Sequence, residues 1–282
     1  MSTQRKLYKT DKVMPTQEEL DRIGRVLKFF PSVSKHPNTL TLQQVWEFNN
    51  LGYISGITIF NETEMRQHRK YFDSLLEDVL SQGGSSYSII SAHMKYGKVF
   101  DLLNHPKIVS CVSDILGEDV IGWGAHYFCK MPYDTKIVGW HQDAGYWPLT
   151  PSKTITVWLA IDDATVENGA MRFVAGSHLL GHITSRQSKP DENSILSQIV
   201  EDVNQYGDIV DNELQAGEIS IHTDLLLHGS NANPSPNRRC GLTLRYCTPD
   251  VIASYKWDRE GVVVSGIDKD GHWGNPSRPY KD

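Results

Sequence analysis

The sequence has no apolar run approaching the ~18 residues that a membrane-spanning helix needs. It has no basic excess either, since 28 Lys and Arg stand against 34 Asp and Glu, for a net charge of −6. Nucleic acid and anionic membranes bind through clustered positive charge, so this balance argues against both as partners. We therefore predict a small-molecule substrate as the partner, while the sequence leaves the oligomeric state open.

Cysteine is also scarce in this chain. The four cysteines, Cys111, Cys129, Cys240 and Cys247, contain no CxxC pair. Neither a disulfide framework nor a zinc knuckle is therefore indicated. The first six residues, MSTQRK, are polar and lack the apolar stretch of a secretory signal. Together these features predict reduced thiols in a cytoplasmic protein.

The part of the chain before Gly117 has helical spacing of its apolar residues. Three capping boxes open predicted helices, at Thr16 with Glu19, Thr41 with Gln44, and Asn61 with Glu64. The first predicts a helix whose apolar positions run from Leu20 to Phe30, closed by Pro31. A fourth helix is predicted around Ile108–Leu116.

After Gly117, short apolar runs separated by turn residues predict strands. Six are expected, near Val120–Met131, Ile137–His141, Thr154–Ile161, Ala170–Val174, Glu218–His222 and Arg239–Thr248. Helices followed by strands predict an α+β protein with an antiparallel β core. We assign residues 1–40 to an N-terminal helical extension and 41–282 to one domain, in which the long polar insertion 181–216 is interpreted as a lid.

Two short motifs place a histidine and an aspartate two residues apart. His141 and Asp143 would point to the same face of a strand, as a pair of metal ligands does. The pattern is weak alone, because His222 and Asp224 repeat it. His141 is favoured because His228 lies well downstream, with Arg239 soon after it; no such pair follows His222, which we predict to be packed beside the site. Two histidines and one carboxylate are the facial triad of non-haem iron enzymes.

Here the sequence resembles the phytanoyl-CoA dioxygenase family of iron(II)- and 2-oxoglutarate-dependent oxygenases. The similarity lies in the run WHQDAGYWPLTP from Trp140 to Pro151, the stretch Thr156–Asp163, and the block from His228-Gly229-Ser230 to Arg239. Glu167-Asn168-Gly169 and Gly176-Ser177-His178 follow the family's order as well. The resemblance covers roughly residues 41 to 250 and implies a double-stranded β-helix, a jelly-roll and cupin-like core with helices packed outside.

The resemblance also assigns roles residue by residue. His141, Asp143 and His228 match the iron ligands, and Arg239 matches the arginine that holds the far carboxylate of 2-oxoglutarate. A guanidinium suits that role, since it grips a carboxylate with two parallel hydrogen bonds. Ser230 and Trp158 match positions that line the co-substrate pocket. The implied activity is a dioxygenase that uses O2 to oxidise, most commonly to hydroxylate, a C–H bond of a small metabolite, with release of succinate and CO2.

The residues leave other interpretations open. Two histidines and a carboxylate also bind zinc in hydrolases, where Arg239 would have no role. A non-catalytic β-helix protein that binds a ligand is a third hypothesis. Arg245, on the same face of a regular strand as Arg239, is the rival carboxylate clamp. His126 and Lys130 could support the site or lie on an exposed strand face. His178 could cap a loop or face the mouth of a cavity.

Overall fold

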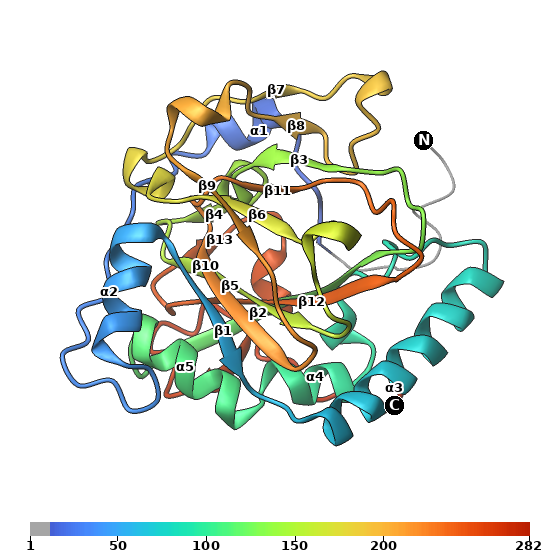
Figure 1. The fold of residues 1–282 in the computed structure, drawn as a ribbon. Coiled ribbons are helices and arrows are strands. Elements are labelled where there is room, and N and C mark those ends of the chain that lie inside the picture. Colours follow the sequence, from blue (N-terminus) through green and yellow to red (C-terminus); the bar gives the residue numbers. More distant parts are fainter. Residues whose placement is uncertain (1–11) are drawn as a thin grey trace.

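The computed structural model describes residues 12–282; the polar segment 1–6 used in the localisation prediction lies outside this range. Two antiparallel sheets face each other and form a double-stranded β-helix (Figure 1). The larger sheet has the order β1-β10-β5-β12-β2-β14 and the smaller one β3-β11-β6-β9. Their strands are β1 Tyr53–Thr58, β2 Val120–Lys130, β3 Val138–His141, β5 Thr154–Ala160, β6 Met171–Val174, β9 Ile209–Asn212, β10 Glu218–Thr223, β11 His228–Ser230, β12 Arg239–Cys247 and β14 Val262–Ser265.

Helices cover the outer face of the larger sheet, below it in Figure 1. They are α2 Leu42–Leu51, α3 Glu62–Ser81, α4 Gly97–Leu103 and α5 Pro106–Leu116, with the short α1 Gln17–Arg22 elsewhere. Capping boxes at Thr16, Thr41 and Asn61 start α1, α2 and α3, and Pro106 occupies the first turn of α5. Within residues 12–282, no helix combines the length and the hydrophobicity required to cross a bilayer.

All six predicted strands are present, in an α+β fold as expected. The remaining pairings are short: β4 Leu149–Thr150 with β13 Ile252–Ala253, and β7 Arg186–Gln187 with β8 Gln198–Ile199. Strands β1, β9, β11 and β14 and helix α4 were not predicted. Strand β1 carries a bulge at Gly56 with φ +74°, and β11 has three residues, so neither shows a run of alternating side chains.

The prediction of a helix through Leu20–Phe30 is wrong beyond Arg22, where α1 ends. Tertiary contacts replace the helix from that point. Arg25 donates hydrogen bonds to the carbonyls of Ala144 and Trp147 at 2.7 and 2.9 Å. Phe29 packs on Phe48, with ring centroids 5.9 Å apart. The apolar residues that looked periodic therefore bind other elements, a tertiary effect that overrides local preference.

Strand β12 separates the helix-covered core from the interior between the sheets. Its side chains alternate, so Leu242, Leu244 and Tyr246 join the core beneath the helices. Arg239 and Arg245 belong to the opposite face, which looks into the space between the two sheets. This alternation places two guanidinium groups inside the β-helix.

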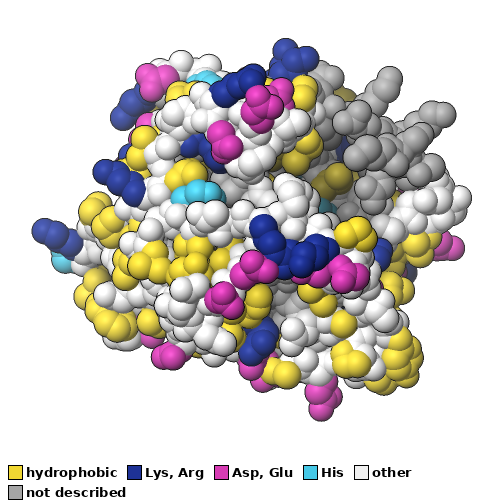
Figure 2. All heavy atoms as spheres, turned by 90° about the horizontal axis from the view of Figure 1, so that it is seen from above, with side chains coloured by type: hydrophobic (Ala, Val, Ile, Leu, Met, Phe, Trp, Pro, Cys, Tyr) yellow, Lys and Arg dark blue, Asp and Glu magenta, His cyan; other side chains and the backbone are white. Residues whose placement is uncertain are grey.

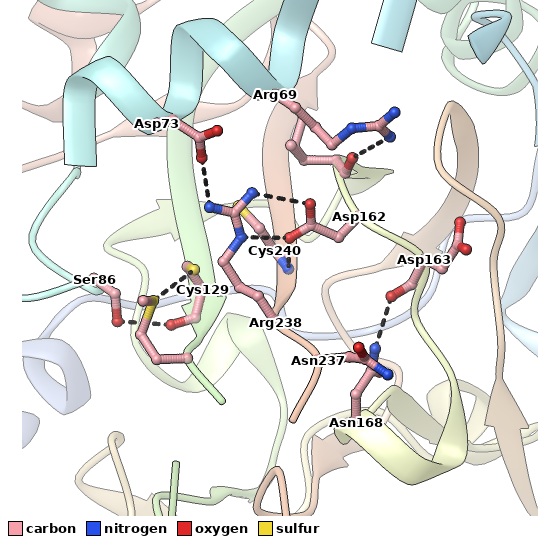
Figure 3. A network of polar contacts seen from close by, with 12 residues as sticks. Arg69, Asp73, Ser86, Cys129, Asp162, Asp163, Asn168, Asn237, Arg238 and Cys240 are labelled. Carbon is pink, nitrogen blue, oxygen red and sulfur yellow. Dashed lines mark hydrogen bonds and ion pairs between the residues drawn. The ribbon is translucent and has the colours of Figure 1, made fainter. Parts of the chain in front are cut away.

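The start of β12 is held by an ion-pair network (Figure 3). Arg238 donates two hydrogen bonds to the Asp162 carboxylate, from Nε at 2.7 Å and from Nη2 at 3.0 Å. The same carboxylate accepts the Cys240 backbone N–H at 3.1 Å, and Arg238 also reaches Asp73 on α3. Arg238 faces α3, away from the space between the two sheets. Because successive side chains of an extended strand alternate, its neighbour Arg239 faces into that space.

His178 joins the N-terminal segment to the β-helix and is fully buried. Its ring packs edge-on against Phe29, with centroids 4.4 Å apart, and Nε2 lies 3.2 Å from the carbonyl of Asn49. Gly52 has φ +88°, and a Cβ there would lie 2.6 Å from the imidazole. Burial lowers the pKa of His178 to about 4.

We expect the fold to lose stability as the pH falls from about 6.5 to about 4, in part through His178. Over this range the imidazole of His178 becomes protonated in the unfolded chain but stays neutral in the folded protein. The free energy of unfolding therefore falls by up to about 1.4 kcal/mol per pH unit. Denaturant unfolding of His178→Gln across this range should show a shallower loss than wild type. His36→Gln, at an exposed position, is the control, and equal slopes in all three proteins would contradict the expectation.

Candidate metal centre

Three side chains from separate points in the sequence meet between the sheets. His141 ends β3 and faces His228, the first residue of β11, as its direct cross-strand partner. Asp143 follows in the turn after β3. The possible ligand atoms of the three side chains all lie within 4.8 Å of one another, and all three residues are buried. The imidazole rings of His141 and His228 have centroids 4.1 Å apart.

The orientation of both imidazoles is set by the backbone. Nδ1 of His141 lies 2.8 Å from the carbonyl of Gly139, and Nδ1 of His228 lies 2.9 Å from that of Leu226. Each Nδ1–H therefore donates to a carbonyl, which leaves the Nε2 lone pairs free. Thr156 donates to Oδ2 of Asp143 at 3.2 Å, while Oδ1 of Asp143 lies 3.7 Å from Nε2 of His141. Hydrogen bonds of this kind are how proteins orient metal ligands.

The electrostatics favour the protonation states in which these groups bind a metal. Burial keeps the pKa of His228 well below its usual value, and the neighbouring His141 adds to this effect. Burial also opposes ionisation of Asp143. The contact with His141, the neighbouring His228 and the charge of Arg245 outweigh it, so the pKa of Asp143 lies well below its ordinary value. Two nitrogen donors and an ionised carboxylate converge on one point, which suits a divalent transition metal.

The second histidine–aspartate motif lies beside this centre. His222 is buried, with its ring centroid 4.8 Å from that of His228, and neither of its ring nitrogens has a hydrogen-bond partner. Asp224 accepts a hydrogen bond from Ser152 at 2.6 Å, and burial raises its pKa to about 7. Within residues 12–282, only His141, Asp143 and His228 form a cluster with metal-ligand spacing. His222 therefore packs against the centre, where the sequence placed it.

Arg239 lies deep in the same interior, with 2% of its surface exposed. It donates from Nε to the carbonyl of Gly169 at 3.0 Å and from Nη2 to Oγ of Ser230 at 3.2 Å. Its guanidinium carbon lies 5.6 Å from the ring centroid of Trp158. A Cβ on Gly241 would come within 2.0 Å of that indole, so the glycine makes room for it. Ser230 and Trp158 thus surround Arg239.

A second cation lies next to Arg239. Lys130 is its cross-strand partner on β2, is fully buried, and donates to the carbonyl of Lys136 at 2.6 Å. Burial, together with the charge of Arg239, lowers the pKa of Lys130 to about 7. In residues 12–282, neither cation is hydrogen-bonded to a carboxylate. Burying positive charge without a counter-charge is costly, so this end of the interior is suited to an anion.

Two supporting residues had no recognisable signal in the sequence. Gln142, between two of the clustered residues, donates to the carbonyls of Leu225 and Gly181 at 2.6 and 2.9 Å. Arg25 braces the turn after β3 from the N-terminal segment, as described above. Both act through backbone atoms far away in the sequence, and such partners leave no trace in local residue patterns.

The insertion 181–216 is bound to the strand that carries His141. The N–H of Val200 donates to the carbonyl of Trp140 at 2.7 Å, and the N–H of Ile183 donates to Oε1 of Gln142 at 2.7 Å. Its middle part contains β8 and the 3-10 turn Val203–Gln205. Its last part, β9, pairs with β6 and belongs to the smaller sheet.

Comparison with known proteins agrees with this geometry. A "Phytanoyl-CoA dioxygenase domain-containing protein 1 homolog" of Dictyostelium discoideum is 34% identical over 122 residues, 42% of this chain and 43% of the relative. A "Probable alpha-ketoglutarate-dependent hypophosphite dioxygenase" of Stutzerimonas stutzeri is 27% identical over 182 residues, 62% of this chain and 63% of the relative. The matches thus span less than two thirds of these curated relatives.

A solved structure extends the similarity over most of the fold. The apo form of the non-heme monooxygenase ThoJ is 28% identical, with a TM-score of 0.71, and the match covers 84% of this chain and 88% of that protein. The family model for phytanoyl-CoA dioxygenase matches residues 89–241, more than half of the chain and all three clustered residues. This chain therefore belongs to the phytanoyl-CoA dioxygenase family.

Proposed function

We propose that this protein is an Fe(II)- and 2-oxoglutarate-dependent dioxygenase that oxidises a C–H bond of a small organic metabolite. The favoured reaction is hydroxylation. The observation that carries the proposal is the cluster of His141, Asp143 and His228, with both imidazole Nε2 atoms free, in the same interior as the buried Arg239. The similarity to the Stutzerimonas stutzeri relative, which is named as a probable alpha-ketoglutarate-dependent dioxygenase, supports this activity.

Each residue has a defined task in this proposal. His141, Asp143 and His228 would hold the iron from one side and leave the other side open. Arg239 and Ser230 would receive the far carboxylate of 2-oxoglutarate, with Trp158 as a wall of its pocket. When bound, iron and 2-oxoglutarate supply the oxidising power through reaction with O2, which yields succinate and CO2. The buried surroundings exclude water from the site.

The direct test adds Fe(II) and 2-oxoglutarate to the protein without oxygen. Bidentate binding of the co-substrate to iron gives a weak visible charge-transfer band. Succinate release is then measured in air against a panel of metabolites. A zinc hydrolase or a non-catalytic binding protein would give neither signal.

Removal of any one of the clustered residues should abolish iron retention and succinate formation. His141→Ala, Asp143→Ala and His228→Ala each delete one of three protein donors. The loss should exceed the roughly 10–100-fold effect of changing groups that only orient ligands. Iron bound after anaerobic desalting gives a readout independent of turnover. His272→Ala, far from the cluster in sequence, is the control, and wild-type iron content in a cluster variant would remove that residue from the site.

Arg239→Lys should raise the 2-oxoglutarate concentration needed for half-maximal succinate release by about tenfold or more. A lysine replaces the planar two-pronged donor with a point charge. Titration of the charge-transfer band should shift in parallel, while iron content stays unchanged. If Arg239→Lys leaves the 2-oxoglutarate requirement unchanged and Arg245→Lys raises it strongly, the clamp is Arg245.

We further propose that residues 1–40 form an extension to a domain spanning 41–282, and that the insertion 181–216 acts as a lid. The hydrogen bonds from Ile183 and Val200 to the strand bearing His141 support this role. The four cysteines, all buried and unpaired, support a cytoplasmic location. Acidic and basic side chains are interspersed on the face shown in Figure 2, with no broad basic area to attract nucleic acid.

The lid should be cleaved by trypsin at Arg186 in the ligand-free protein, and Fe(II), 2-oxoglutarate and substrate should slow that cleavage. Closure would bury a bond that is accessible when the lid opens. Mass spectrometry of the fragments identifies the cut. Cleavage at Arg22, in the exposed helix α1, provides an internal reference. Equal rates at Arg186 with and without ligands would show that the insertion is an ordinary surface loop.

A further inference from the structure

Arg245 is a partly buried cation that the proposed reaction does not use. It lies on the inward face of β12, at the opposite end from Arg239. Its Nε is inaccessible and has no hydrogen-bond partner. The guanidinium carbon lies 5.2 Å from the ring centroid of Trp147 and 5.9 Å from that of Trp123. Aromatic faces hold the group in place without satisfying its donors.

Several other arginines have anionic partners. Arg238 is paired with Asp162, Arg172 with Asp211 and Arg278 with Asp101. In residues 12–282, no carboxylate lies within 4.0 Å of the Arg245 guanidinium. The carboxylate that interacts with it electrostatically is Asp143, which is assigned above to the iron.

The charged groups around Arg245 do not neutralise it. Desolvation lowers the pKa of His93 to about 4 and that of His126 to about 3, so neither carries a charge near neutral pH. Lys12 lies 3.0 Å from Oε2 of Glu260. Glu260 is paired with Lys12, because its Oε2 accepts hydrogen bonds from Lys12 at 3.0 Å and from Ser91 at 2.7 Å, while its buried Oε1 has no hydrogen-bond partner. With Fe(II) bound, the metal, Asp143 and Arg245 together carry a charge of +2. The carboxylate of 2-oxoglutarate next to the iron would lower this to +1, which one further anionic group would balance.

We infer that Arg245 binds an oxyanion of the substrate, a carboxylate or a phosphorus oxyanion, and so selects acidic metabolites. The inference rests on the proposed function, since the substrate must lie between Arg245 and the iron ligands. The planar fork of a guanidinium matches both kinds of oxyanion. Trp147 belongs to the turn that follows Asp143, so an oxyanion at Arg245 lies next to the iron site.

Arg239 and Arg245 have separate ligands in this arrangement. Their Cα atoms are six residues apart on one strand, roughly 20 Å by the usual rise per residue. The Arg239 guanidinium packs on Trp158, whereas that of Arg245 packs on Trp147 and Trp123, so the two groups have different surroundings. Arg239 would therefore hold the co-substrate while Arg245 holds the substrate.

The test measures binding by calorimetry in protein preloaded, without oxygen, with Fe(II) and saturating 2-oxoglutarate. The probes are phenylacetate, phenylphosphonate and the neutral phenylacetamide. Wild type should bind at least one oxyanion about tenfold to a hundredfold more tightly than the amide, as for a charged hydrogen bond. The two oxyanion arms show which acid class the site prefers.

Arg245→Gln should lose this preference while the charge-transfer band and iron content remain. Arg245→Lys keeps the charge and should retain part of the preference, which covers the case in which the glutamine variant does not fold. Arg172→Gln is the matched control, because Arg172 also lies over a tryptophan, Trp140, at 5.8 Å but is paired with Asp211. It should bind the probes like wild type.

Two binding results would overturn the inference: no oxyanion preference in wild type, or an unchanged preference in both Arg245 variants. Loss of the charge-transfer band when an oxyanion is added would also overturn it, because the oxyanion would then bind at Arg239 in place of 2-oxoglutarate. The titration is repeated with metal-free protein. Absence of the band in wild type before any probe is added would instead refute the proposed function, so the two failures can be told apart.

Discussion

The candidate site depends on one cross-strand pairing, that of His141 on β3 with His228 on β11. Side chains alternate along a strand, so a slip of one residue in either strand would turn its histidine to the opposite face. The pairing is secured on both sides of the cluster. Gln142 donates a hydrogen bond from the turn after β3 to the backbone just before β11. Each imidazole is hydrogen-bonded to the carbonyl of the residue two positions earlier in the sequence. The proposed metal ligands are thus positioned by backbone geometry.

Charge is distributed along the interior in a pattern that matches the proposed chemistry. Positive groups lie at both ends of β12, and the ionised Asp143 lies between the sheets near one of them. Uncompensated charge inside a protein costs several kcal/mol per ion, so anions are favoured at these positions of the folded protein. This distribution of charge supports the proposed affinity for acidic ligands.

The two terminal regions complete the site although neither carries a metal ligand. Arg25 holds the turn that contains Ala144 and Trp147, and the N–H of Val13 donates to the carbonyl of Tyr255 at 3.0 Å. Glu260, in the C-terminal region, accepts a hydrogen bond from Lys12. The start and the end of the described chain therefore meet beside Arg245, where the substrate is proposed to bind.

The sequence by itself predicted the fold class and six of the strands, because these depend on local spacing. It indicated the residues of the cluster through a distant histidine and arginine and through the family resemblance. The alternation of side chains along a regular strand was enough to predict Arg239 and Arg245 on one face. The tertiary structure alone decided where helix α1 ends, that His178 and Lys130 are buried, and that within residues 12–282 Arg245 has no ion pair. Each of these outcomes depends on groups distant in the sequence, and local patterns carry no information about such partners.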